Sequence, residues 1–293
     1  MVILVYCAIV ACSVTQSATT KLFNKHSANS AVFNAVKALS SFLLFALMAI
    51  GGFTFHLPTL LFGLSYGTAL CLSMYTGYRA LCQGPMALTS MLVSFSVIVP
   101  LLWGVTVGNE QLTPIRIVAL ILLLCAIVLT NADKLRGKRA PREADAPSKK
   151  SSYLTWMLFV GATFLCNGIC SVLQKQHQTL YPATYNREFM FFAMLLCALV
   201  FLAVLLAKCS PAAIKATKGT WLGALSGVAN GLAGFFTLLL AGLENASVLF
   251  PIISAGTLLG VVLCGRFLLK EKLRLNHYLA LLLGMLAVVF LKL

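Results

Sequence analysis

Apolar stretches long enough to cross a lipid bilayer recur along the whole 293-residue chain, with short polar segments between them. A helix that crosses the hydrocarbon core needs about 20 predominantly apolar residues. The pattern predicts ten transmembrane helices, at residues 2–21, 31–52, 59–80, 86–107, 116–132, 153–173, 186–207, 220–240, 247–268 and 277–291. The first stretch lacks the basic start of a signal peptide, so we expect it to be kept as the first helix.

The composition supports an all-α integral membrane protein. Sixty per cent of the residues are hydrophobic and 10% are charged, whereas soluble domains typically carry about 25% charged residues. The ten cysteines occur singly in apolar segments, without metal-ligand spacing, and are expected to be packing residues. The sequence contains no HExxH, GxSxG or P-loop motif. We therefore expect no enzyme activity and no metal or cofactor.

A basic linker divides the chain into two halves. Residues 133–152 contain seven basic and three acidic residues together with two prolines, a composition typical of a disordered segment. The predicted organisation is a first five-helix repeat at 1–132, a cytoplasmic linker at 133–152 and a second five-helix repeat at 153–293.

The two halves resemble each other in sequence. A shift of 161 residues pairs Gly104 with Gly265 and Glu110 with Glu271, and a shift of 151 pairs Gln16 with Asn167. An odd number of helices per repeat places the second repeat upside down in the bilayer. Secondary transporters commonly have such inverted repeats, with the substrate site near the midplane between them.

The distribution of basic residues predicts the orientation. The net charge is +15, but the basic residues lie in connecting loops rather than on one face of a domain, which argues against a nucleic-acid partner. Loops after odd-numbered helices contain 17 Lys and Arg residues, and the other side contains four. Because cytoplasmic loops retain positive charge, both termini are predicted to lie outside the cell.

Polar residues within the predicted spans are the candidates for a substrate site, because they are costly unless they face a partner or a wet cavity. The candidate substrate-binding residues are Gln16, Asn34, Lys37, Tyr75, Asn167, Asn186 and Asn230. For each, a hydrogen bond between helices is the alternative to cavity lining. Lys37 is suited to attract a carboxylate or phosphate, or else to extend toward the membrane interface. No carboxylate lies in the middle of a predicted helix, which argues against proton-coupled export of organic cations.

Glycines recur every four residues in two predicted helices, at residues 219, 223, 227 and 231 and at residues 63 and 67. Such stripes let a neighbouring helix approach closely. They predict tight packing, with a sliding surface as the alternative.

The segments "PLLWGVTVGNEQLTPIRIVALILLLCAIVL" and "LGVVLCGRFLLKEKLRLNHYLALLLGMLAVVFL" each place a glutamate in a short turn between two helices. This arrangement resembles the end of each repeat in the EamA-type branch of the drug/metabolite transporter superfamily. The stretch "YRALCQGPMALTSMLVSFSVIVPLL" is similar to that family's helix 3–4 hairpin. The resemblance implies a ten-helix transporter with a central cavity, in which Glu110 and Glu271 hold the turns and do not touch substrate.

These features together predict a secondary transporter in a bacterial inner membrane. We expect it to export a small polar, amino-acid-like metabolite by alternating access, with the substrate and the lipid bilayer as its partners and a homodimer left open. Movement of a lipid-linked intermediate and a non-transporting membrane scaffold are the alternatives.

Overall fold

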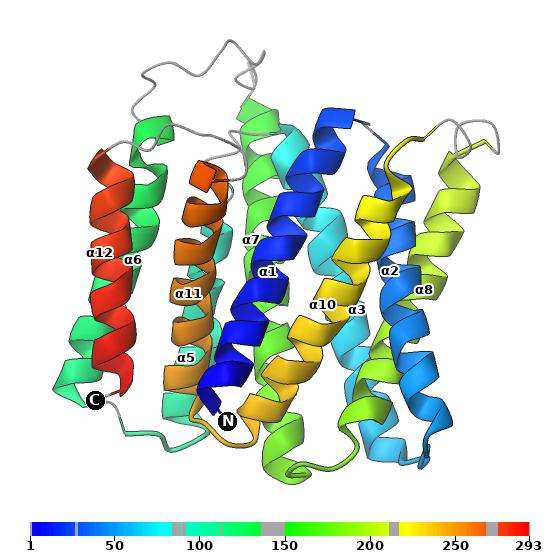
Figure 1. The fold of residues 1–293 in the computed structure, drawn as a ribbon, viewed down its shortest axis with the longest axis horizontal. Helices are drawn as coiled ribbons and strands as arrows, with labels where there is room; N and C mark the ends of the chain where they lie inside the picture. Colours follow the sequence, from blue (N-terminus) through cyan, green and yellow to red (C-terminus); the bar gives the residue numbers. More distant parts are fainter. Residues whose placement is uncertain are drawn as a thin grey trace. The chain divides into compact units, whose positions relative to one another are not determined.

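The computed structural model describes residues 2–26, 29–83, 89, 92–111, 113–135, 150–210, 217–267 and 275–292. These residues form helices and no strand (Figure 1). The helices of the first sequence half are α1 (Val2–His26), α2 (Ser30–Ile50), α3 (Leu57–Gln83), the short 3-10 helix η1 (Phe95–Val97), α5 (Ile98–Thr106) and α6 (Pro114–Leu135). Those of the second half are α7 (Lys150–Leu180), α8 (Asn186–Lys208), α10 (Thr220–Ala241), α11 (Ala246–Phe267) and α12 (Leu275–Lys292).

The helices are those of a multi-pass membrane protein. Six described helical segments are long and apolar enough to cross a bilayer, and they belong to α1, α2, α3, α7, α8 and α10. Four shorter apolar helical segments lie at 92–106, 114–129, 246–261 and 278–291. The predicted all-α membrane fold is therefore confirmed at this coarser level.

Both helices beside the predicted linker extend into it. α6 continues to Leu135 and α7 begins at Lys150, because the Ala, Lys and Leu residues at these edges are good helix formers. The rest of the linker, residues 136–149, lies outside the described residues. α7 also continues seven residues beyond its predicted end at residue 173, to Leu180.

The chain forms two compact units, and neither coincides with a half of the sequence. Unit 1 comprises Met1–Cys71 and Leu173–Leu243, and unit 2 comprises Leu72–Val172 and Glu244–Leu293. Each unit combines segments from both halves, and the long helices α3 and α7 contribute one part to each unit. The repeats predicted at 1–132 and 153–293 are thus divisions of the sequence and not compact bodies.

Glycines of α10 set the packing of unit 1. α10 lies against both α1 and α2 (Figure 1). A Cβ added at Gly227 would lie 2.2 Å from the Lys37 carbonyl oxygen, and one at Gly223 would lie 3.3 Å from the Phe33 carbonyl oxygen. The predicted glycine stripe therefore packs against the backbone of α2, as small residues do between membrane helices.

The same kind of contact joins α3 to α8 within unit 1. A Cβ at Gly63 would lie 2.8 Å from the Phe189 carbonyl oxygen, and one at Gly67 would lie 2.8 Å from the Ala193 carbonyl oxygen. In both helix pairs, two glycines four residues apart meet two carbonyl groups four residues apart. This close approach leaves no room for a side chain at Gly63, Gly67 or Gly227, whereas at Gly223 the neighbouring atoms would have to move slightly.

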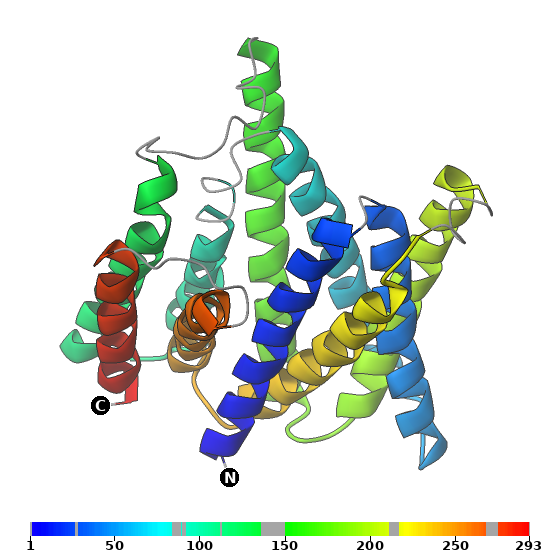
Figure 2. The same cartoon turned by 45° about the horizontal axis from the view of Figure 1, so that its top comes forward.

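Unit 2 has its own apolar core. α12 packs along α6 and α11, as both views of the ribbon show (Figures 1 and 2). Leu123 and Ile127 of α6 meet Ala255 of α11 and Ala287 of α12. A second contact joins α7 to residue 89, where the buried Trp156 donates a hydrogen bond of 2.9 Å from Nε1 to Thr89 Oγ1.

Candidate substrate-binding site

The structure divides the seven candidate residues between the two units. Unit 1 contains Gln16, Asn34, Lys37, Asn186 and Asn230, on helices α1, α2, α8 and α10. Unit 2 contains Tyr75 and Asn167, on α3 and α7.

Lys37 and Gln16 form a polar pair inside unit 1. Lys37 Nζ donates a hydrogen bond of 3.2 Å to Gln16 Oε1 and so joins α2 to α1. With a rise of 1.5 Å per residue, Lys37 lies about 10 Å from the start of α2 and Gln16 about 15 Å from the end of α1. Both residues lie in apolar segments that are long enough to cross a membrane, Gln16 in Val2–Thr20 and Lys37 in Ser30–Ile50.

Asn34 and Asn230 are polar residues of α2 and α10, two helices that pack against each other. Asn34 lies three residues before Lys37 on α2, and therefore on the same side of the helix. Asn230 lies three residues after Gly227, whose backbone packs against the Lys37 carbonyl group. Both amides are half-buried, and neither forms a side-chain hydrogen bond with the residues that the structure describes. We call Gln16, Asn34, Lys37 and Asn230 the Lys37 cluster; they lie on α1, α2 and α10, where α10 packs against both other helices, and Lys37 and Gln16 are in contact.

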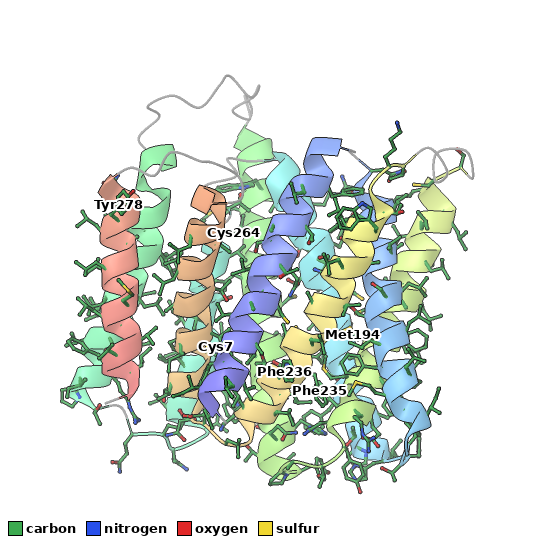
Figure 3. The ribbon with its side chains drawn as sticks, in the orientation of Figure 1. Cys7, Met194, Phe235, Phe236, Cys264 and Tyr278 are labelled. Atoms are coloured by element: carbon green, nitrogen blue, oxygen red, sulfur yellow. The ribbon has the colours of Figure 1, made fainter. Side chains whose placement is uncertain are left out.

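The remainder of the interior of unit 1 is largely apolar. Phe45 packs against Phe235 with ring centroids 6.0 Å apart, and Met194 is buried. Figure 3 shows Met194 on α8 and Phe235 and Phe236 on α10. Polar groups in such surroundings need hydrogen-bond partners.

Asn167 has a partner on another helix. Ser73 Oγ donates a hydrogen bond of 2.5 Å to Asn167 Oδ1, and the hydroxyl oxygens of Thr76 and Thr163 lie 2.8 Å apart one turn away. These contacts join α3 to α7 in unit 2. They match the alternative in which the amide holds two helices together.

Tyr75 and Asn186 also contact protein groups. Arg79 Nε donates to the Tyr75 hydroxyl at 3.3 Å, and the guanidinium lies 5.5 Å from the centre of the Tyr75 ring. Asn186 Oδ1 accepts a short hydrogen bond from Gln178 Nε2 at the start of α8. The seven candidates therefore do not form one cluster: four belong to the Lys37 cluster and three to separate contacts.

A second polar cluster, formed by His56, Thr59, His177 and Gln178, lies where α3 begins and α7 ends. His56 Nδ1 lies 2.9 Å from Thr59 Oγ1, and the same oxygen lies 3.2 Å from His177 Nε2. His177 Nδ1 lies 3.1 Å from Gln178 Nε2. We call these four residues the histidine chain.

One backbone amide fixes the direction of the histidine chain. The N–H of Ala183 can only donate, and it donates to Gln178 Oε1 at 3.2 Å. Gln178 Nε2 is therefore the donor to His177 Nδ1, which makes His177 a neutral imidazole with its proton on Nε2. That proton is donated to Thr59 Oγ1, which also lies within hydrogen-bond distance of His56 Nδ1.

Sequence patterns missed the histidine chain because the polar run Gln174–Gln178 looked like a loop. In the structure this run forms the last turns of α7, with Gln174, His177 and Gln178 buried. Their spacing of three and four residues, which puts all three on one side of a helix, is the signal that marks this face.

Glu110 connects its turn to another helix. Its backbone N–H donates to the Gly104 carbonyl oxygen at 3.0 Å, which holds the turn that follows α5. Its carboxylate accepts hydrogen bonds from the N–H groups of Ala246 (2.6 Å) and Ser247 (2.8 Å) at the start of α11. The carboxylate therefore caps α11, a role that the expected turn function did not include. Glu271 lies outside the described residues.

The first-half glycine of the repeated motif makes room for this carboxylate. A Cβ at Gly104 would lie 2.7 Å from Glu110 Oε2. The spacing of six residues between glycine and glutamate, which recurs at Gly265 and Glu271, thus has a steric reason in the first half.

No protein-family model matches the chain, and a search of curated proteins found none that matches. Among solved structures, one described as "Crystal structure of protein" superposes with a TM-score of 0.77 over 98% of this chain and 94% of its own. The two sequences are 14% identical. The chain is therefore similar in fold to an experimentally solved protein.

Proposed function

We propose that this protein is a secondary transporter of the bacterial inner membrane that carries a small polar, amino-acid-like metabolite by alternating access, in the outward direction. We further propose that it belongs to the EamA-type branch of the drug/metabolite transporter superfamily. The observation that carries the transport proposal is the Lys37 cluster.

Polar groups at membrane depth that lack protein partners indicate a path for a polar molecule. Asn34 and Asn230 are partly exposed on helices that are apolar enough to span a bilayer, and the described residues offer them no hydrogen bond. Contact of either amide or of the Lys37 ammonium with lipid tails would be energetically unfavourable. Contact with water or with a bound solute satisfies their hydrogen bonds.

The packing of unit 1 supports the inverted repeat on which alternating access depends. The contact of Gly63 and Gly67 with Phe189 and Ala193 mirrors the contact of Gly223 and Gly227 with Phe33 and Lys37. Thus α3, a glycine-containing helix of the first half, packs on α8 of the second half. Likewise α10, a glycine-containing helix of the second half, packs on α2 of the first half. Reciprocal contacts of this kind are expected when two related halves pair about a two-fold axis.

An uptake experiment tests the proposal. The purified full chain is reconstituted into proteoliposomes and supplied with radiolabelled amino acids and related polar metabolites, with and without an imposed pH gradient. We expect at least one compound to accumulate above protein-free liposomes, and the gradient to show whether protons are coupled.

Two other results would each replace the proposal. A folded protein that moves no solute but speeds the exchange of a lipid-linked compound between leaflets is a lipid translocase. A folded protein that moves neither is a scaffold. A thermal melt of the reconstituted protein shows that it is folded in each case.

A further inference from the structure

We propose that Lys37 and Gln16 bind an anionic oxygen group, a carboxylate or a phosphate, of the transported molecule. This inference rests on the proposed transport function and names the chemical class of its substrate. It is argued from the charges of unit 1, from the free donors of the pair and from their depth in the helices.

Unit 1 has no carboxylate available to neutralise Lys37. The sequence of this unit contains a single acidic residue, Glu188. Glu188 Oε1 accepts hydrogen bonds from the N–H and the hydroxyl group of Thr54, at 3.2 and 3.1 Å, beyond the end of α2. Lys37 lies 13 residues before Ile50, the last residue of α2, which is about 20 Å along the helix. Glu188 therefore occupies the opposite end of unit 1.

Lys37 and Gln16 keep donors for a further acceptor. An ammonium group has three N–H bonds, and among the described residues Gln16 Oε1 accepts one of them. Because Oε1 faces the ammonium, the amide nitrogen of Gln16 remains a donor and forms no hydrogen bond with the described residues. Among the described residues, two ammonium N–H bonds and one amide group thus have no acceptor and can meet the two oxygens of a carboxylate or the oxygens of a phosphate.

The position of the pair in apolar helical segments favours such a partner. An isolated ammonium in hydrocarbon surroundings is strongly unfavourable unless an anion or water compensates it. Charge-assisted hydrogen bonds to a carboxylate or phosphate are shorter and stronger than those to neutral acceptors. The same positive charge repels a purely cationic substrate, so this site favours anionic and zwitterionic molecules.

The neutral amides of the Lys37 cluster complement this assignment. Asn34 and Asn230 each offer one acceptor oxygen and two donor hydrogens. Amides of this kind suit the amine and hydroxyl groups of an amino-acid-like molecule. The cluster thus divides recognition between one charged group and two neutral ones.

Binding to the purified full chain in detergent tests the inference. The probes are L-amino acids, each compared with its own amide, and inorganic phosphate, with sodium chloride at equal ionic strength as the reference. We expect at least one acid or phosphate to raise the melting temperature, and the amide that lacks the carboxylate to bind at least about tenfold more weakly. The acid and phosphate arms distinguish the two oxygen groups.

Three variants locate the site. Lys37→Gln is expected to raise the Kd of the anion at least about tenfold. Gln16→Glu supplies an internal carboxylate to Lys37 and is expected to abolish anion binding while the protein stays folded, which covers the case in which Lys37→Gln unfolds. Lys175→Gln is the matched control: it removes a lysine of unit 1 whose Nζ donates to the Ala241 carbonyl oxygen at 3.0 Å, and it should leave the Kd unchanged.

The outcomes separate this inference from the transport proposal. Equal binding of acids and amides, an unchanged Kd in Lys37→Gln or Gln16→Glu, or no binding of any anion to the wild-type chain overturns the anion site. Flux of an uncharged solute in proteoliposomes would then still support transport. Anion binding that depends on Lys37 without flux of any solute keeps the site and removes the transport function.

Discussion

At the residue scale, the hydrogen-bond direction of the histidine chain depends on one side chain. Gln178 accepts a hydrogen bond from the Ala183 N–H and donates one to His177. Its side-chain amide therefore connects the turn that contains Ala183 to a buried imidazole. His177 is buried and has no bulk water to replace Gln178, whereas Ala183 is exposed.

The first prediction concerns Gln178→Leu. The substitution leaves the buried His177 Nδ1 without its donor, and we expect it to lower the free energy of unfolding by about 1–3 kcal/mol. Thermal unfolding of the purified variant in detergent measures this. Thr179→Ala is the control, because the exposed Thr179 hydroxyl bonds only to the Lys175 carbonyl oxygen of its own helix. Equal stability of the two variants would contradict the assigned direction.

A second prediction at this scale concerns Glu110→Gln. The amide keeps one acceptor oxygen, so one of the Ala246 and Ser247 N–H groups faces an NH2 group instead. We expect a loss of about 1.5–3 kcal/mol in the free energy of unfolding, on the scale of hydrogen bonds to charged groups. The exposed neighbour Gln111→Ala should change the melting temperature little. A similar effect of both changes would show that the α11 cap contributes nothing.

At the element scale, the sequence was a better guide to the presence of helices than to their ends and partners. The apolar pattern predicted α7 but ended it too early. Its last turns contain the polar run Gln174–Gln178, and consecutive polar residues are interpreted as a loop when helices are predicted from apolar positions. Likewise, Gln16 and Asn167 matched along the sequence, yet they occupy different units with different partners. Which helix a polar side chain meets is decided by tertiary packing, which sequence spacing does not encode.

The glycine stripes are the counterexample, since a spacing of four predicted close packing and the structure shows it. Gly227→Ala tests the contact with the smallest possible side chain, because its Cβ would lie 2.0 Å from Ser40 Oγ and 2.2 Å from the Lys37 carbonyl oxygen. We expect a loss of about 1–3 kcal/mol in the free energy of unfolding.

Gly161→Ala is the matched control for this change. It is also a glycine inside a helix, but a Cβ there meets nothing within 4 Å. Alanine should leave the protein as stable as before or stabilise it by up to about 1 kcal/mol, through its higher helix propensity. If both glycines tolerate alanine equally well in a thermal melt, then α10 does not pack against α2 as closely as these distances state.

At the scale of the whole molecule, composition and apolar periodicity are sufficient to predict a multi-pass helical membrane protein. The reason is that backbone polar groups inside a bilayer must be hydrogen-bonded within the protein, which long apolar helices achieve. They were not sufficient to predict the compact units. Each unit joins segments from both halves, and long-range pairing such as α2 with α8 or α6 with α12 depends on side-chain fit that a hydropathy pattern does not contain.

The last prediction concerns the orientation of the chain in the membrane, and it rests on the 17 basic residues of one side against four on the other. In unit 1 the turn between α7 and α8 belongs to the side poor in positive charge, and the segment that follows α8 belongs to the rich side. A cysteine introduced at the exposed Thr184 should react with a membrane-impermeable maleimide added to intact cells, whereas one at the exposed Ser210 should react only after the cells are opened. The parent chain, with its ten native cysteines, gives the background labelling. Labelling of Ser210→Cys but not Thr184→Cys in intact cells would reverse the orientation, place both termini in the cytoplasm and open the Lys37 end of unit 1 to the outside.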